Sequence, residues 1–336
     1  MGIRRTIGRI GVHTSLFGVG SYVRLLARRE LRILAYHRII DPNHAYDSEN
    51  VSADLENFDW QMRYMRKNYD VISFQELKSI IESGDVLPKR CAMITFDDGF
   101  ADNYFNAFPI LKELGMPALF SVITSMVGTE EMFWFDRAAC LVKRAQSGQT
   151  LKFGSLSMRL DDNNRETHTA CFLQFLKDQP DHIRREFIEQ IDVQLAPLLP
   201  SSAELAPHFP LNWDQIRLMS DAGMEIGSHT HSHPILAKLP SEESIVSELS
   251  TSKSIIESHT DGPCLVVSYP EGLDYAIDER VDRAAETSGF DFGLTSIRGV
   301  NSLPMGAKYR LDRIQVHHSN DRTLFQGSVQ FPEIVV

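Results

Sequence analysis

Short apolar runs alternate with helix-like segments along most of this 336-residue chain. The runs are typical of buried strands, and the segments between them repeat apolar residues at helical spacing. A helix between two strands returns the chain to the same end of the sheet, so the alternation predicts parallel pairing. We therefore expect an α/β fold, a distorted (β/α) barrel of about seven parallel strands. The strand-like runs lie near residues 71–73, 92–96, 118–123, 224–227, 264–268, 290–295 and 314–316.

The alternation stops between about residues 133 and 210. Helical segments and one short β-like patch occupy this stretch, and several prolines precede the next strand-like run. We interpret it as a mainly helical insertion within a barrel unit that spans residues 31–336. Insertions at the carboxyl ends of barrel strands commonly shape the approach to a site.

Two adjacent carboxylates, Asp97 and Asp98, end the strand-like run 92–96 and precede a glycine. In α/β folds the carboxyl ends of the strands usually carry the chemistry. Adjacent residues on an extended segment point in opposite directions, so one Asp can bind a cation while the other faces a reactant. Asp-Asp-Gly by itself is also a common turn sequence, so its meaning depends on a second motif.

His229 and His233 form that second motif, directly after the run 224–227. They lie about one helical turn apart, so a local coil directs both rings at one ion, and Pro234 limits the coil to a short turn. With one of the carboxylates they give three ligands and leave a coordination position for water, as catalytic zinc sites require. Zinc is the expected ion, although cobalt, nickel, manganese and iron accept the same donors. His231, between them, is expected to face elsewhere.

These two motifs resemble the metal-binding motifs of the polysaccharide deacetylase family, also called the NodB-homology or carbohydrate esterase family 4 domain. The family's fold is the same distorted (β/α) barrel. The resemblance covers roughly residues 32 to 318 apart from the insertion. It is carried further by residues 34–39, 110–118, 213–233 and 268–272.

The resemblance implies a role for each matching residue. Asp97 is implied to be the general base, and Asp98, His229 and His233 are implied to be the metal ligands. In the family, water activated by the metal and the base attacks an acetyl carbonyl, and the oxyanion is held by the metal and a backbone amide. The implied enzyme is a hydrolase of carbon–nitrogen bonds other than peptide bonds.

The third motif, residues 268–272, departs from the family pattern at two positions. Ser268 stands where many members carry an Arg that orients the base, and Glu271 stands where an aromatic residue is common. The resemblance still assigns the oxyanion-holding amide to Glu271 and places Tyr269 at the substrate. Arg313, on another predicted strand, is a candidate to hold the base through a bidentate contact.

Two histidines are candidates for the remaining roles. The family uses a late histidine as the acid that protonates the leaving amine, and alternation along the run 314–316 favours His317 over His318 for this role. His37 lies in residues 34–39, which resemble the family's opening strand, and is a candidate pocket residue at the end of that strand. For each of them the alternative is a solvent-exposed loop histidine.

The formal net charge of −11 argues against a nucleic-acid partner, because no basic stripe with interleaved aromatics offsets it. The four cysteines are widely spaced, without a C-x-x-C motif, which fits a reducing compartment. We therefore expect a cytoplasmic protein. A hydrophobic content of 43% fits one large core rather than two equal domains.

Residues 1–30 differ from the rest of the chain because arginines flank an apolar, glycine-containing stretch with a single acid. The stretch is too interrupted for a clear signal peptide and too short to span a bilayer comfortably. It fits a basic amphipathic segment, which predicts peripheral contact with an anionic inner-membrane surface. The alternative is a helix that covers the open end of the barrel.

The leading functional hypothesis is therefore a metal-dependent deacetylase that removes N-acetyl groups from an amino sugar, in a polysaccharide or on a lipid-linked glycan. The alternatives are an O-acetyl esterase or a non-sugar amidase with the same site, and a glycan-binding module that has lost turnover. Phe133, Trp134 and Phe135 fit either a core cluster or a surface that stacks on sugar rings.

Overall fold

The computed structural model describes residues 29–333. Strands close into a barrel in the order β1-β13-β11-β10-β9-β6-β5 and back to β1, and every pairing around it is parallel. The expected barrel of about seven parallel strands is therefore confirmed. The strands are β1 (Glu30–Tyr36), β5 (Cys91–Phe96), β6 (Leu119–Val122), β9 (Glu225–Ser228), β10 (Val266–Ser268), β11 (Phe292–Arg298) and β13 (Leu311–Gln315).

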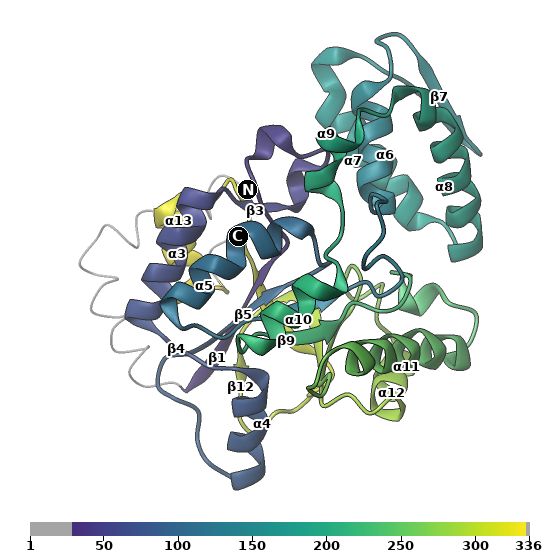
Figure 1. Ribbon diagram of the computed structural model, residues 1–336. Coiled ribbons are helices and arrows are strands. Elements are labelled where there is room, and N and C mark those ends of the chain that lie inside the picture. The colour runs from purple at the N-terminus through teal and green to yellow at the C-terminus, as the bar shows by residue number, and fades with distance from the viewer. Residues whose placement is uncertain (1–28, 334–336) are drawn as a thin grey trace.

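Helices cover the outside of the barrel (Figure 1). They pack through apolar faces onto a core that the strands fill from within, as the alternation in the sequence predicts. Four short strands complete the sheets: β4 (Asp70–Val71), β12 (Asn301–Ser302), and the pair β2 (Arg38–Ile39) and β3 (Val51–Ala53). The covering helices are α3 (Leu55–Asn68), α4 (Phe74–Ser83), α5 (Phe108–Leu114), α10 (Trp213–Asp221), α11 (Glu242–His259), α12 (Glu279–Thr287) and α13 (Arg322–Gln330).

Helix boundaries follow local chemistry. Ser73 caps α4 through a reciprocal capping box with Glu76, and Gly115 ends α5 in the left-handed conformation. The helical segment of residues 103–114 begins as a π-helical turn, Asn103–Ala107, and continues as α5. Pro109 lies at the start of α5 and has no N–H to donate to the preceding turn, which explains the break.

The insertion folds around a hydrophobic cluster of its own and stands above the barrel in Figure 1. Phe133, Trp134 and Phe135 are all buried in this cluster, so the core interpretation of these aromatics is correct for most of their surface. The insertion contains α6 (Trp134–Arg144), the hairpin β7 (Thr150–Phe153) and β8 (Leu156–Arg159), α7 (Arg165–Asp178), α8 (Asp181–Leu195) and the short α9 (Ser202–Leu205).

A fully buried arginine ties the insertion to the barrel. Arg38 donates from Nε to Asp102 at 2.9 Å and from Nη2 to the Pro207 carbonyl at 2.6 Å, and its Nη1 lies 3.0 Å from His208 Nδ1 and 3.5 Å from Asp136. Partners from three separate segments, at residues 102, 136 and 207–208, thus share one cation. The insertion is therefore fixed against the strand that leads into the site.

No helix within residues 29–333 combines the length and apolar character needed to cross a bilayer. The basic amphipathic segment expected over residues 1–30 lies almost entirely outside the described residues. Its two interpretations remain predictions.

Candidate active site

Three side chains converge at the carboxyl ends of neighbouring strands. Asp98 follows β5, and His229 and His233 follow β9. One ligand atom of each lies within 4.8 Å of the others, and Asp98 Oδ1 is 3.3 Å from His229 Nε2 and 3.6 Å from His233 Nε2. All three are buried, and they form the one such group of three or more metal-binding side chains in the described part of the chain. The cluster has the donor set that the sequence predicts.

The two histidine rings meet through a left-handed turn rather than a helical coil. Thr230 and His233 have φ angles of 67° and 58°. The Thr230 N–H donates to Ser228 Oγ, and the His233 N–H donates to Thr230 Oγ1, each at 3.0 Å. The expectation of a short turn holds, although its backbone is not helical. His231 points away from the cluster and contacts Thr124 Oγ1 at 2.9 Å.

Backbone strain in the described residues is concentrated at this cluster. Positive φ angles outside glycine occur at Asp98, Thr230, His233 and Glu271. A non-glycine residue in the left-handed region costs about 1–2 kcal/mol, so four of them in one place cost stability that packing must offset. Such strain persists where it aims side chains and amides at a common point. Gly99 is also left-handed, and a Cβ added there would lie 2.8 Å from Val122 Cγ1.

The histidine rings are prepared to bind a cation through Nε2. The Ser268 carbonyl can only accept, so His229 Nδ1 must donate to it at 2.8 Å, which leaves the Nε2 lone pair facing Asp98. Burial and the neighbouring His229 lower the pKa of His233 to about 3, so this ring is neutral at physiological pH. Trp134, from the insertion, lies against the same ring, with Nε1 3.3 Å from His233 Nδ1. The insertion thus supports one of the ligands directly.

Asp97 is held by an arginine from across the barrel. Arg313, on β13, donates from Nη1 to Asp97 Oδ1 at 3.0 Å and from Nη2 to Oδ2 at 2.7 Å. The arginine is itself fixed by the Thr295 carbonyl at 2.6 Å. Burial alone raises the pKa of Asp97, but the charge of Arg313, reinforced by two histidines, outweighs burial and holds this pKa below its usual range. Asp97 is therefore an ionised carboxylate, and it is not one of the three side chains whose ligand atoms converge.

Ser268, where the family pattern predicted an orienting arginine, is fully buried and shares a 2.9 Å hydrogen bond with Ser121. An arginine reaches Asp97 from β13 instead, as the sequence suggested for Arg313.

The histidine beside Asp97 is His37 rather than His317. His37 Nε2 lies 4.0 Å from Asp97 Oδ2, and His37 lines the cleft. His317 is absent from the residues that line the cleft: its Nδ1 contacts Ser319, and its Nε2 lies 3.4 Å from Glu49. The structure therefore does not support the expectation that His317 protonates a leaving group. Strand alternation gave the direction of the side chain but not the course of the chain after β13.

The third motif contributes backbone more than side chains. Glu271 lines the cleft with a φ angle of 62°, and its N–H makes no hydrogen bond within residues 29–333. The Tyr269 ring is buried in the core, where a Cβ added at Gly293 would lie 2.2 Å from its hydroxyl oxygen. Tyr269 also lines the cleft, although its ring packs in the core, so its expected contact with substrate remains a prediction.

The cleft above the triad has a volume of about 170 Å³. Part of its wall was not anticipated from the sequence: Asp47 and Asn50 come from the segment between β2 and β3, Lys177 from α7 and Ser296 from β11. Burial and the nearby Asp136 raise the pKa of Asp47 to about 6. No motif marks these positions, since they reach the cleft from a loop, from a helix of the insertion and from a barrel strand away from the two motifs.

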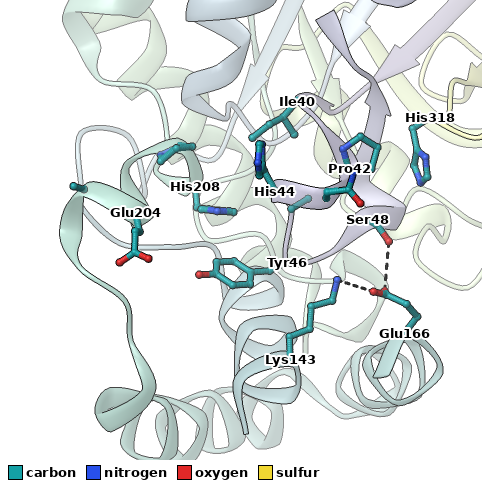
Figure 2. Close-up of a pocket in the computed structure, with 14 residues that line it drawn as sticks. Ile40, Pro42, His44, Tyr46, Ser48, Lys143, Glu166, Glu204, His208 and His318 are labelled. Carbon is teal, nitrogen blue, oxygen red and sulfur yellow. Dashed lines mark hydrogen bonds and ion pairs between the residues drawn. The ribbon is translucent and has the colours of Figure 1, made fainter. Parts of the chain in front are cut away.

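The segment between β2 and β3 also lines a second cavity of about 750 Å³, against the insertion (Figure 2). Figure 2 shows Lys143 paired with Glu166 across its wall, at 3.0 Å, and Tyr46 beside His208. None of Asp98, His229 and His233 lines this cavity. The chemistry is therefore assigned to the smaller cleft.

The sequence profile of the polysaccharide deacetylase family matches residues 84–293. The Bacillus subtilis protein YxkH is 23% identical over 302 residues, which cover 90% of this chain and 76% of that protein. A Staphylococcus aureus poly-beta-1,6-N-acetyl-D-glucosamine N-deacetylase is 31% identical over 115 residues, which cover 31% of this chain and only 39% of the relative. The crystal structure of the Streptococcus pyogenes deacetylase PplD with acetate shares the fold, at a TM-score of 0.58 and 20% identity, and the match covers 89% of this chain and 97% of PplD.

Proposed function

Because this chain belongs to the polysaccharide deacetylase family, whose members are hydrolases of carbon–nitrogen bonds, we propose a specific reaction for its cleft. The protein removes N-acetyl groups from an amino sugar, in a polysaccharide or on a lipid-linked glycan, in a metal-dependent reaction. An N-acetylated glucosamine substrate is supported by the name of the Staphylococcus aureus relative. The observation that carries the proposal is the geometry of Asp98, His229 and His233 beside a separately held Asp97.

The triad fits a catalytic divalent cation. One carboxylate oxygen and two imidazole nitrogens, with a fixed tautomer at His229, supply three protein ligands and leave room for water. A cation bound there lowers the pKa of a water molecule and polarises the acetyl carbonyl. Zinc is proposed as the native ion, and cobalt, nickel, manganese and iron are accepted by the same donors.

Asp97 acts as the general base in this proposal. Its carboxylate is ionised and faces the cleft beside the triad, so it can accept the proton of the attacking water. Arg313 fixes both of its oxygens and therefore its direction. The base is thus positioned before substrate binds.

His37 and Glu271 complete the machinery. His37 lies within 4.0 Å of the base and is partly open to solvent, so we assign to it the proton transfer to the leaving nitrogen. The Glu271 N–H, held in the left-handed conformation, is assigned to the acetyl oxygen as negative charge develops on it. Asp47 and Asn50 are positioned to bind sugar hydroxyls.

Acetate release provides the test. The purified protein should release acetate from N-acetylated chito-oligomers faster than from acetylated xylan, lose this activity with chelator and regain it with added zinc. Faster release from xylan would favour the O-acetyl esterase. No release from either glycan, together with purification free of metal and no response to chelator, would identify a binding module instead.

Membrane association remains a separate proposal. The basic, apolar character of residues 1–30 supports peripheral contact with an anionic surface on the cytoplasmic side, which would bring the cleft near a lipid-linked substrate. The described residues include only the last two positions of this segment.

A further inference from the structure

An ion pair joins the insertion to the third motif at the edge of the cleft. Lys177 Nζ, at the end of α7, lies 2.9 Å from Glu271 Oε1. The second carboxylate oxygen of Glu271 accepts from the Tyr275 hydroxyl at 3.0 Å. Both partners are largely shielded, with 27% of the lysine side chain and 16% of the glutamate side chain exposed. The carboxylate is therefore held at both oxygens.

The position of Glu271 makes its charge a problem for the proposed reaction. The amide assigned to the developing oxyanion belongs to the same residue as the carboxylate, so the two negative charges come within a few ångströms of each other. At such a distance, in a site partly shielded from water, like charges repel strongly enough to slow the reaction. An uncompensated carboxylate at this position would oppose the transition state that its own amide stabilises.

Lys177 is the cation in direct contact with this carboxylate. Two other cations act on the Glu271 charge only at longer range, because their direct contacts are with other groups: Arg184 donates to Asp181 at 2.5 Å, and Lys238 donates to the Lys177 carbonyl. The latter contact fixes the end of α7 from which the Lys177 side chain extends. Removing the Lys177 ammonium therefore leaves Glu271 with a hydroxyl partner and no opposite charge in contact.

We propose that Lys177 is a positioning residue for deacetylation: it neutralises Glu271 and pins its side chain, so that the Glu271 amide faces a substrate oxyanion without an opposing charge. The proposal rests on the function proposed above for the cleft. Under this proposal the insertion takes part in catalysis through Lys177 and does not only line the cleft. The proposal also explains how an acidic residue is tolerated at a position where the family resemblance predicted an aromatic one.

A double-mutant cycle tests the coupling. Lys177→Met should lower kcat by about 10- to 100-fold with KM changed less than about threefold, because charge is lost where the transition state becomes negative. Lys177→Arg should retain most of the activity. In a Glu271→Gln background, Lys177→Met should change kcat less than about threefold. An equal loss in both backgrounds, or a loss confined to KM, would overturn the proposal.

Lys143→Met serves as the matched control, since Lys143 lies in the same insertion and pairs with Glu166 at 3.0 Å, away from the triad. It should behave as the unmodified protein. Lys177→Gln gives a second neutral variant if the methionine variant does not fold, and far-UV circular dichroism and metal content check each protein. A kcat for both neutral variants equal to that of Lys143→Met would also overturn the proposal.

Acetate binding gives a readout that requires no turnover. The dissociation constant of acetate, measured by calorimetric titration of the metal-loaded protein, should rise about tenfold in Lys177→Met, remain unchanged in Lys143→Met, and recover when Glu271→Gln is added. If acetate affinities across the variants follow this pattern but the unmodified protein releases no acetate from glycans, only the proposed function would be contradicted. Acetate affinity that is insensitive to Lys177 would contradict the charge-compensation proposal alone.

Discussion

Replacing Arg313 by methionine removes the only cation that contacts Asp97 at hydrogen-bond distance within the described residues. Both side chains are buried, and two charge-assisted hydrogen bonds, of 3.0 and 2.7 Å, are lost together. Breaking a buried pair by removing one partner costs about 3–5 kcal/mol, because the remaining charge is left without compensation. For a chain of 336 residues the cost corresponds to a fall in Tm of about 4–7 °C.

The pH dependence identifies the cause of that loss. In the unmodified protein the pKa of Asp97 lies below its unfolded value, so the carboxylate contributes stability above the unfolded pKa and loses it as pH falls through the folded pKa. Without Arg313, burial dominates and raises the folded pKa above the unfolded one. The variant is then destabilised at neutral pH, and this destabilisation decreases as pH falls and the Asp97 carboxylate is protonated. The stability difference between the two proteins should therefore be largest near pH 7 and shrink towards about pH 4.

Chemical unfolding at both pH values, with chelator present so that metal loss does not contribute, measures this difference. Arg310→Met is the control, because Arg310 also contacts a carboxylate, Asp282, with two bonds, of 3.0 and 2.9 Å, but at the surface, and should cost about 0–1 kcal/mol. The acid limb of kcat/KM should move to higher pH in Arg313→Met only. A stability loss equal to that of the control, or one independent of pH, would show that Arg313 does not compensate the buried charge of Asp97.

Three further predictions address the machinery and the N-terminus. Asp97→Asn should abolish turnover with metal retained, whereas His229→Ala should lose both by elemental analysis; retained metal in the second variant contradicts the ligand assignment. His37→Asn should lower kcat about 10²- to 10⁴-fold, as loss of a general acid does, while His317→Asn changes it less than about twofold; the reverse order would restore the original expectation for the acid. Deleting residues 1–25 should leave activity in solution intact and weaken sedimentation with anionic vesicles; unchanged sedimentation would end the membrane proposal.

The barrel could be predicted because each strand has its own local sequence signal. Runs such as 92–96 and 264–268 are short and apolar, and the segments between them carry helical periodicity and caps, such as Ser73 and Gly115, that act within a few residues. Periodicity does not predict a local change in the hydrogen-bond pattern of a helix. The π-helical turn at Asn103–Ala107 follows from one missing N–H at Pro109.

The candidate reactive side chains could be predicted from the sequence, but not all of the contacts that hold them in place. Asp98, His229 and His233 reach one point because each follows a parallel strand of the same barrel, which the sequence shows. The left-handed turn between the histidines depends on tertiary contacts of the loop. Lys177 lies on a helix of the insertion, where the alternation of strands and helices stops. No sequence spacing therefore predicts its contact with Glu271.

The most direct test of the account is a crystal structure of the protein grown with zinc, with diffraction measured on both sides of the zinc absorption edge. We predict one anomalous peak about 2.0–2.2 Å from Asp98 and from the Nε2 atoms of His229 and His233, with Asp97 still bound to Arg313 and free of the ion. A peak bonded to Asp97, a peak elsewhere, or no ion at the triad would contradict the central claim.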